Sequence, residues 1–383
     1  MSIEKKKSSE AKNEGTNPIF DSRVKILVVG IGGGGSSIVF ELAKNVKRAN
    51  FILINTDNQA LQALKGLSKN LNLSTLLIGK ELFDGLGTGM DVEKGEKAAL
   101  ESEKEIKEVL KGYDLIILVS CLGGGTGTGA ISIINRISKE LGSVTYGIFT
   151  YPFDFEGEKR KKLSNMAINK IKKEIDSFSL VLNQKIFDFI NKETSIEEAF
   201  SLINKKLNKS LNGLINTISE PGLINTDWAD LQTIFRQKRG LSYLNSIDID
   251  TESLIKIDTP EDFSKLFLSG SIYSYGIENS SGVLLNIFTK DNISLSHINK
   301  ISSSVSNLVD ENAKIIIGIN DKKNISNIML LAVGCNDEIL GNNEDSFSFE
   351  TSTQSMNYNN VRKREAINDD SYWDIPTFIR KGK

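Results

Sequence analysis

The sequence is poor in the residues that most often hold metal ions, form disulfides or carry acid–base chemistry. Its 383 residues include two cysteines, Cys121 and Cys335, and a single histidine, His297. Both cysteines stand beside apolar runs, which favours buried free thiols in a reducing compartment over a disulfide or a metal site. The histidine lies in a polar segment, which disfavours histidine-dependent catalysis and histidine-ligated metals. Any chemistry should therefore depend on carboxylates, amides and hydroxyls.

A strong net charge and a long apolar segment are also missing. The 47 basic and 49 acidic residues leave a net charge of −2, which argues against a surface that holds nucleic acid by bulk charge. We expect neither a signal peptide nor a membrane span. The hydrophobic content of 39% suffices for real cores, and the length favours two domains with tails.

Glycine, by contrast, is concentrated in two runs. Residues 123–130 read Gly-Gly-Gly-Thr-Gly-Thr-Gly-Ala between the apolar run 115–119 and a helical pattern that starts at Ile131. A strand that enters a helix through such a turn brings bare N–H groups and a helix N-terminus to one point, where phosphate can bind. Side chains would hold the oxygens away, and several φ angles are expected to be positive. A flexible linker is the alternative, which this position between strand and helix disfavours.

The other glycine run, residues 30–37, follows the strand-like run 24–29 and precedes a helical pattern over 38–45. Alone it would indicate a dinucleotide fold, with Asp57 near the position of a ribose-binding acid. A second phosphate cradle at residue 123 is not part of that fingerprint. Two cradles fit one polyphosphate, so we favour a nucleoside triphosphate over NAD, and an oxidoreductase is the weaker hypothesis.

Apolar runs and helical patterns alternate through residues 23–195, which predicts an α/β, Rossmann-like domain with a parallel sheet covered on both faces. An amphipathic helix is expected over residues 196–220, where apolar residues recur at three- and four-residue spacing. It would lead to a smaller α+β domain over residues 221–340. The predicted strands are 24–29, 51–54, 115–119, 144–149 and 178–182 in the first domain and 282–289, 314–319 and 327–334 in the second.

Both ends of the chain lack a core pattern. Residues 1–22 are expected to form a disordered tail, and residues 341–370 a flexible linker that spans about 30 Å. Residues 371–383 turn abruptly aromatic and apolar, which is typical of a docking peptide that folds on binding. An ordered return to the core is the alternative.

Several motifs together resemble FtsZ, the family of tubulin-related GTPases of bacterial cell division. Residues 123–130 match the phosphate loop of the family, 30–37 its first glycine loop and 55–61 the segment after the second strand. Residues 152–160 are similar to its ribose-side loop, and 222–231 to the loop that the family inserts into the nucleotide pocket of the next subunit. The resemblance covers residues 23–240 well, the second domain loosely and the C-terminal peptide closely.

The resemblance implies a GTPase that assembles head-to-tail into filaments of the division ring and is activated by polymerisation. It further implies a cytoplasmic location at the division site beneath the inner membrane, GTP or GDP with Mg²⁺ as cofactors, and no metal ligands from the protein. The chain itself would be the main partner, with no nucleic acid and no direct membrane insertion. Membrane-anchoring and regulatory division proteins would bind the tail through Asp374, Ile375, Pro376, Phe378, Ile379 and Arg380.

The resemblance also assigns site residues. Asp227, Asp230 and Asn225 would be catalytic, and the alternative for Asp227 is capping of the helix that follows it. The nucleotide-binding residues would be Gly33, Gly34, Gly35, Ser36, Ser37, Asn55, Asp57, Gly123, Gly124, Gly125, Thr126, Gly127, Thr128, Glu156, Arg160, Asn183, Phe200 and Asn204. Phe200 fits core packing and base stacking equally well, because it lies on the apolar stripe of its helix.

The chain departs from the family at several of its motifs. Ser37-Ile38 replaces a common Asn-Ala pair, and Asp91-Val92 replaces Asn-Pro, which adds a negative charge near the expected γ-phosphate. Asn204 stands where the family reads guanine with Asp, and residues 236–276 match poorly. These changes keep open a second hypothesis, a structural paralogue that binds nucleotide and co-assembles but hydrolyses poorly. The retained Asp227 and Asp230 argue against it.

Overall fold

The computed structural model describes residues 24–68, 71–191, 193–220, 222–224, 226–237, 239–249, 253, 256–257, 259–268, 271–289, 294–321 and 326–336. The predicted N-terminal tail, the linker, the docking peptide and Asn225 lie outside the described residues.

The first sheet has six parallel strands in the order β3-β2-β1-β4-β5-β6. This confirms the predicted α/β class and the five predicted strands. Strand β3 was missed because it is a half-buried edge strand without a fully buried residue, so its sequence lacks a continuous apolar run. The strands are β1 (Ile26–Ile31), β2 (Asn50–Asn55), β3 (Leu73–Leu77), β4 (Leu115–Cys121), β5 (Val144–Tyr151) and β6 (Ser177–Leu182).

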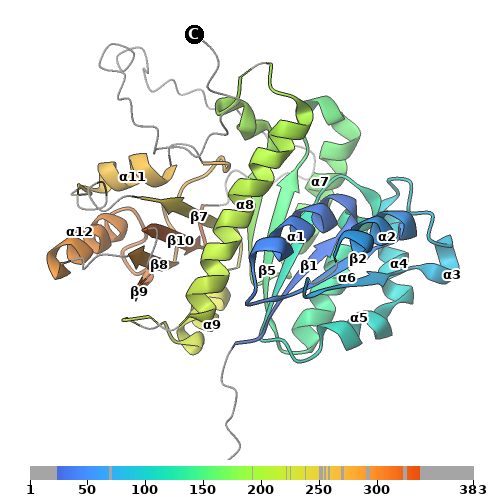
Figure 1. Ribbon diagram of the computed structural model, residues 1–383, viewed down its shortest axis with the longest axis horizontal. Helices are drawn as coiled ribbons and strands as arrows, with labels where there is room; N and C mark the ends of the chain where they lie inside the picture. Colours follow the sequence, from blue (N-terminus) through green and yellow to red (C-terminus); the bar gives the residue numbers. More distant parts are fainter. Residues whose placement is uncertain are drawn as a thin grey trace, which may run out of the picture.

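Helices cover both faces of this sheet, as predicted (Figure 1). Strands β1 and β4 are buried along almost their whole length, which explains their unbroken runs of Ile, Leu and Val. Because all six strands are parallel, their carboxyl ends share one edge of the sheet, where ligands of such folds bind. The helices are α1 (Gly32–Asn45), α2 (Asn58–Leu67), α3 (Lys80–Phe83), α4 (Val92–Glu101), α5 (Glu103–Leu110), α6 (Gly125–Glu140) and α7 (Glu158–Ile171), with 3-10 turns η1 (Asp154–Glu156) and η2 (Asn183–Asp188).

Helix α8 (Ile196–Ser219) runs between the two sheets (Figure 1). It begins with a capping box, in which Ser195 accepts from the Glu198 N–H and Glu198 accepts from the Ser195 N–H. Its 24 residues give a length of about 36 Å at 1.5 Å per residue. Its apolar stripe is buried from Ile203 to Ile215, as the spacing predicts, whereas Ile196 and Phe200 near its start are exposed. This helix therefore fixes the distance between the segment that precedes Ile196 and the loop that follows Ser219.

The second sheet contains β7 (Ser242–Asp248), β8 (Gly282–Thr289), β9 (Lys314–Asp321) and β10 (Asn327–Val333) in the order β7-β10-β8-β9. Strand β10 is antiparallel to both of its neighbours, whereas β8 and β9 are parallel. The three strands predicted for this part of the chain are β8, β9 and β10. Helices α9 (Trp228–Gln237), α11 (Pro260–Leu268) and α12 (Leu295–Ser306) pack with this sheet or beside it.

The poorly matching segment 236–276 contributes strand β7 and part of a buried tyrosine cluster. The Tyr275 hydroxyl donates to the Ser242 carbonyl at 2.9 Å, and the Tyr273 hydroxyl donates to the Leu244 carbonyl at 2.9 Å. Tyr146 of the first sheet pairs with the Ser179 hydroxyl at 2.7 Å. Burial raises the pKa values of Tyr146, Tyr273 and Tyr275, and it raises that of the neighbouring Tyr243 to about 12, so these phenols stay protonated at neutral pH. The segment thus joins the two sheets through a buried, hydrogen-bonded seam.

Among the described residues, no helix is long and apolar enough to cross a membrane. Neither Cys121 nor Cys335 is in a disulfide. Cys335 is buried beside β10, as predicted, whereas Cys121 is only partly buried.

Candidate nucleotide-binding site

Both glycine runs lie where a strand of the first sheet turns into a helix. Helix α1 begins at Gly32 directly after β1, and α6 begins at Gly125 four residues after the end of β4 at Cys121. The predicted helix starts at Ile38 and Ile131 were therefore wrong, because the glycines themselves form the first helical turns. The N-termini of two helices, each with free N–H groups and the positive end of a helix dipole, lie at the same edge of the sheet.

We predicted positive φ angles at several of these glycines. In the structure, most of them are instead needed because a side chain would collide with neighbouring atoms. Within the two runs, φ is positive only at Gly32 (72°) and Gly123 (92°). A Cβ atom on Gly35 would collide with the Val119 carbonyl, and one on Gly125 would collide with the Thr88 hydroxyl. By contrast, Gly33 and Gly124 have open space at the Cβ position. The glycines thus let α1 and α6 approach the neighbouring backbone.

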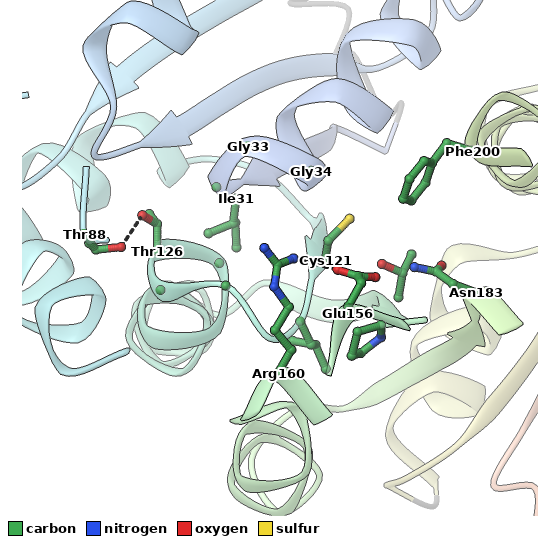
Figure 2. A pocket seen from close by; sticks show the side chains of 17 residues that line it. Ile31, Gly33, Gly34, Thr88, Cys121, Thr126, Glu156, Arg160, Asn183 and Phe200 are labelled. Atoms are coloured by element: carbon green, nitrogen blue, oxygen red, sulfur yellow. Dashed lines mark hydrogen bonds and ion pairs between the residues drawn. The ribbon is translucent and has the colours of Figure 1, made fainter. Parts of the chain in front are cut away.

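A cavity of about 280 Å³ lies between these helix starts and α7. Figure 2 shows Thr88 and Thr126 at one end, Asn183 and Phe200 at the other, and Gly33 and Gly34 of α1 along one side. The lining residues are Ile31, Gly32, Gly33, Gly34, Thr88, Cys121, Leu122, Gly124, Gly125, Thr126, Gly127, Thr150, Pro152, Glu156, Arg160, Asn183 and Phe200.

The threonine end of the cavity has the chemistry of a phosphate site. The Thr126 hydroxyl lies 2.6 Å from the Thr56 hydroxyl and 3.4 Å from that of Thr88. Both Thr88 and Thr126 are nearly buried, so their hydroxyls are held in place by their neighbours. These hydroxyls stand beside the N–H groups of the α6 N-terminus, which together can hold phosphate oxygens.

The opposite end of the cavity is aromatic and amide-lined, which suits a base and a ribose. Arg160 pairs with Glu156 at 2.6 Å, and Glu156 also accepts a hydrogen bond from the Phe153 N–H at 2.9 Å. The Phe200 ring packs edge-on against Phe153 and remains 39% exposed, so its free surface faces the cavity (Figure 2). Of the two uses open to Phe200, this position favours contact with a ligand over core packing.

Ten of the predicted nucleotide-binding residues line this cavity. They come from α1, the start of α6, the 152–160 segment, η2 and α8, which are far apart in sequence. The ten are Gly33, Gly34, Gly125, Gly124, Thr126, Gly127, Glu156, Arg160, Asn183 and Phe200.

Eight of the predicted residues do not line the cavity, and most of them form hydrogen bonds within the helices and loops around it. Asp57 caps α2 by accepting from the Ala60 N–H at 3.0 Å, and Thr128 accepts from the Gly123 N–H at 3.0 Å. Asn204 is half-buried on α8, one turn beyond Phe200. The eight are Gly35, Ser36, Ser37, Asn55, Asp57, Gly123, Thr128 and Asn204. Direct contact of these residues with nucleotide stays a prediction.

Ser36, Ser37 and Asn55 bond to the backbone around the first glycine run. The Ser36 and Ser37 hydroxyls donate to the carbonyls of Gly30 and Gly33, respectively, and the Asn55 side chain accepts from the Thr56 N–H at 2.9 Å. Both serine hydroxyls, including that of Ser37 where the family commonly has Asn, therefore donate to backbone carbonyls at the start of α1.

Cys121 is among the cavity residues that the sequence did not assign to the site, with Ile31, Gly32, Thr88, Leu122, Thr150 and Pro152. Burial raises the pKa of the Cys121 thiol to about 11, so the thiol is protonated and a poor nucleophile at neutral pH. Its position at the carboxyl end of β4, just before a glycine run, could have predicted that it lines the site. Residues at strand ends line such sites whatever their type.

The predicted catalytic carboxylates lie far from this cavity. Asp227 accepts from the Ala229 N–H at 3.3 Å, which is the capping role stated as its alternative, and Asp230 lies on α9. Phe200 and the loop that follows α8 are separated by about 30 Å of helix, at 1.5 Å per residue. Figure 1 shows α9 at the far end of α8. Within one subunit, the carboxylates and the cavity are therefore apart.

Comparison with known proteins agrees with this architecture. Residues 25–191 match the model of the GTPase domain of the Tubulin/FtsZ family. The cell division protein FtsZ of Buchnera aphidicola subsp. Baizongia pistaciae is 30% identical over 382 residues, which covers 93% of this chain and 96% of that protein.

Solved structures of FtsZ and CetZ proteins share this fold. An empty FtsZ dimer from M. jannaschii superposes with a TM-score of 0.71 at 29% identity, covering 82% of this chain and 89% of the other. CetZ2 from Haloferax volcanii, a GTPγS-bound protofilament, has a TM-score of 0.68 over 82% of this chain and 94% of the other, and at 18% identity it supports the fold alone. By sequence along nearly its whole length and by fold, this chain belongs to the Tubulin/FtsZ family.

Proposed function

We propose that the chain is a GTPase that assembles head-to-tail into filaments of the bacterial division ring and hydrolyses GTP at the contacts between subunits. The observation that carries this proposal is the separation of the nucleotide cavity from Asp227 and Asp230 along α8. One subunit cannot bring these groups together, whereas a second copy stacked end to end can. Such a contact uses two different surfaces, so it produces an open filament.

The chemistry of phosphoryl transfer indicates what each of the two subunits would contribute to hydrolysis. Hydrolysis of a γ-phosphate requires a positioned water and groups that neutralise charge. The N-termini of α1 and α6 would bind the phosphates, and Asp227 and Asp230 of the next subunit would orient the water, with Asn225 beside them in sequence. Phosphate release would then weaken the contact between subunits, so the filament would turn over.

Mg²⁺ is the metal expected with a nucleoside triphosphate. In the described parts of the chain, no three His, Cys, Asp or Glu side chains cluster to hold a metal. The protein oxygens at the phosphate end of the cavity include the hydroxyls of Thr88 and Thr126. This donor set fits a Mg²⁺ ion held mainly by phosphate oxygens and water, which would neutralise charge on the phosphates.

Phosphate release from GTP, measured with light scattering over a range of protein concentrations, tests this function. The proposal requires a shared threshold concentration, because assembly completes the active site. Turnover that is proportional to protein concentration, without a threshold, would contradict it. Assembly and binding without turnover would instead favour a structural paralogue, which the changes at Asp91, Asn204 and residues 236–276 motivate. The Asp91 carboxylate caps α4 by accepting from the Lys94 N–H at 3.1 Å, and its backbone lies against Gly125.

Changing Asn204 to Asp should sharpen the preference for GTP over ATP. An aspartate accepts from both the N1–H and the exocyclic amine of guanine, whereas an asparagine offers one carbonyl and one amide donor. Asn204 lies one turn beyond Phe200 on α8, within the element that supplies the base end of the cavity. Competition of GTP and ATP against a fluorescent GTP analogue measures the preference. An unchanged ratio would show that residue 204 does not contact the base.

We further propose that residues 371–383 recruit membrane-anchoring and regulatory division proteins to filaments in the cytoplasm beneath the inner membrane. A chain truncated after Asp370 should assemble and hydrolyse GTP normally but fail to concentrate at the division site, because the peptide follows a polar stretch whose sequence has no core pattern. Sedimentation with GTP and fluorescence microscopy of the tagged protein measure the two properties. A truncated chain that cannot assemble would refute the docking role.

A further inference from the structure

We propose that Lys314 is a positioning residue for the carboxylate that one subunit offers to the nucleotide of the next. This inference rests on the proposed function. It begins from an ion pair in which the Lys314 Nζ lies 2.5 Å from the Asp230 Oδ1. The two residues are 84 positions apart, and the pair joins α9 to the first residue of β9.

The backbone on both sides of this pair is held firmly. The Lys314 N–H donates to the Ser281 carbonyl at 2.9 Å, and Lys314 stands opposite Gly282 in the register of β8 and β9. Helix α9 packs on the same strand, because a Cβ atom on Gly282 would lie 3.2 Å from the Ile234 side chain. The ammonium therefore fixes the Asp230 carboxylate relative to the second sheet.

The pair is nevertheless open to a neighbouring molecule. The side chains of Lys314 and Asp230 are 36% and 50% exposed. Asp227 begins the same helix, so Lys314 lies at the end of the subunit that carries both proposed catalytic carboxylates. A subunit that offers Asp230 to its neighbour must offer Lys314 with it.

The charges around the cavity show why this lysine is needed. Among the described residues that line the cavity, Arg160 is the only cation, and it is paired with Glu156 at 2.6 Å. The lining side chains therefore add no net positive charge to that of the two helix N-termini. Two incoming carboxylates would repel the phosphates and each other in a partly water-excluded contact.

Lys314 relieves this repulsion in two ways. Its ammonium neutralises Asp230, so the loop can approach the phosphates with less net negative charge. It also binds Oδ1, which leaves Oδ2 to accept a hydrogen bond from the attacking water. The carboxylate then acts on the water while the lysine sets its orientation.

The test compares three variants of the full-length chain. Lys314→Met should lower kcat for GTP in fully assembled protein by up to about hundredfold, the loss expected when a reacting group is misplaced by about 1 Å. Lys314→Arg should retain most of the activity, because it keeps the cation. GTP affinity below the assembly threshold should be equal in all variants, since Lys314 lies at the far end from the cavity.

Lys209→Met is the matched control, because Lys209 pairs with Asp248 at 2.7 Å with side chains 40% and 48% exposed. If Lys314→Met does not fold or assemble, Lys314→Gln replaces it in the same comparison. Turnover equal to that of Lys209→Met would overturn the role of Lys314. A loss that Lys314→Arg does not restore would overturn it as well, since the cation would then not be what matters.

A mixing experiment shows on which nucleotide Lys314 acts. Gly124→Asp subunits, whose phosphate cradle holds a carboxylate, should restore turnover to Lys314→Met subunits by supplying Lys314 to their nucleotide. Failure of this rescue in mixed filaments would contradict a role between subunits.

An Asp230→Asn variant separates the two proposals. If it is inactive while Lys314→Met is active, only the role of Lys314 fails. If Asp230→Asn is fully active, the proposed function itself fails.

Discussion

Replacing Asp230 with Asn is expected to reduce GTP turnover by assembled subunits about hundredfold or more, the size of effect typical of removing an acid–base or orienting group. GTP binding should be unchanged, because Asp230 lies on α9, at the far end of α8 from the cavity. Filaments should lengthen, since phosphate release no longer weakens their contacts. Phosphate release, GTP affinity and electron microscopy measure the three properties.

Asp248→Asn is the control for this variant, because Asp248 also forms an exposed ion pair with a lysine, at the other end of the second sheet. Exposed pairs of this kind contribute about 0.2–1 kcal/mol to stability, so neither variant should unfold. Loss of GTP binding in Asp230→Asn would contradict the assignment of Asp230 to the nucleotide of a neighbouring subunit.

Replacing Gly124 with Asp is expected to abolish GTP binding while preserving the fold. Gly124 is the N-cap of α6, with φ −89° and ψ 173°, and has open space at its Cβ position. Aspartate is a preferred N-cap residue in this conformation, so the helix should tolerate it. Its carboxylate would enter the cavity at the phosphate end. Two unit charges 4 Å apart repel by about 4 kcal/mol at an effective dielectric constant of 20, which corresponds to roughly a thousandfold loss of affinity.

Gly124→Asn provides the control, because asparagine caps helices as well as aspartate does and has nearly the same shape without the charge. Titration of a fluorescent GTP analogue compares the affinities, and circular dichroism reports thermal stability. Equal affinity in the Asp and Asn variants would mean that Gly124 does not face the phosphates.

The sequence predicts the first sheet well because parallel strands buried on both faces leave continuous apolar runs, as in β4. It also predicts much of the cavity, since a glycine run between a strand and a helix has few structural uses. The helix starts were misplaced because glycine has low helix propensity. What decides these positions is packing, as at Gly35 against the Val119 carbonyl, and packing between distant segments leaves no local signal.

Features that depend on long-range contacts were not predictable. Lys314 is 84 residues from Asp230, and nothing in the local sequence of either residue indicates the pair. The same holds for the buried tyrosine seam, in which Tyr146 and Tyr275 join strands from different sheets through Ser179 and Ser242. The distance between the cavity and α9 could not be predicted from the sequence either. It depends on the direction in which α8 runs away from the cavity, which only the structure shows.

Mixing Gly124→Asp subunits with Asp230→Asn subunits tests the central claim most directly. Each variant alone should be inactive, the first because it cannot bind GTP and the second because it offers no catalytic carboxylate. In a mixture, Gly124→Asp subunits would present Asp230 to GTP held by their Asp230→Asn neighbours, so phosphate release should reappear and peak at an intermediate ratio. A mixture that assembles by light scattering yet remains inactive at every ratio would contradict an active site shared between subunits.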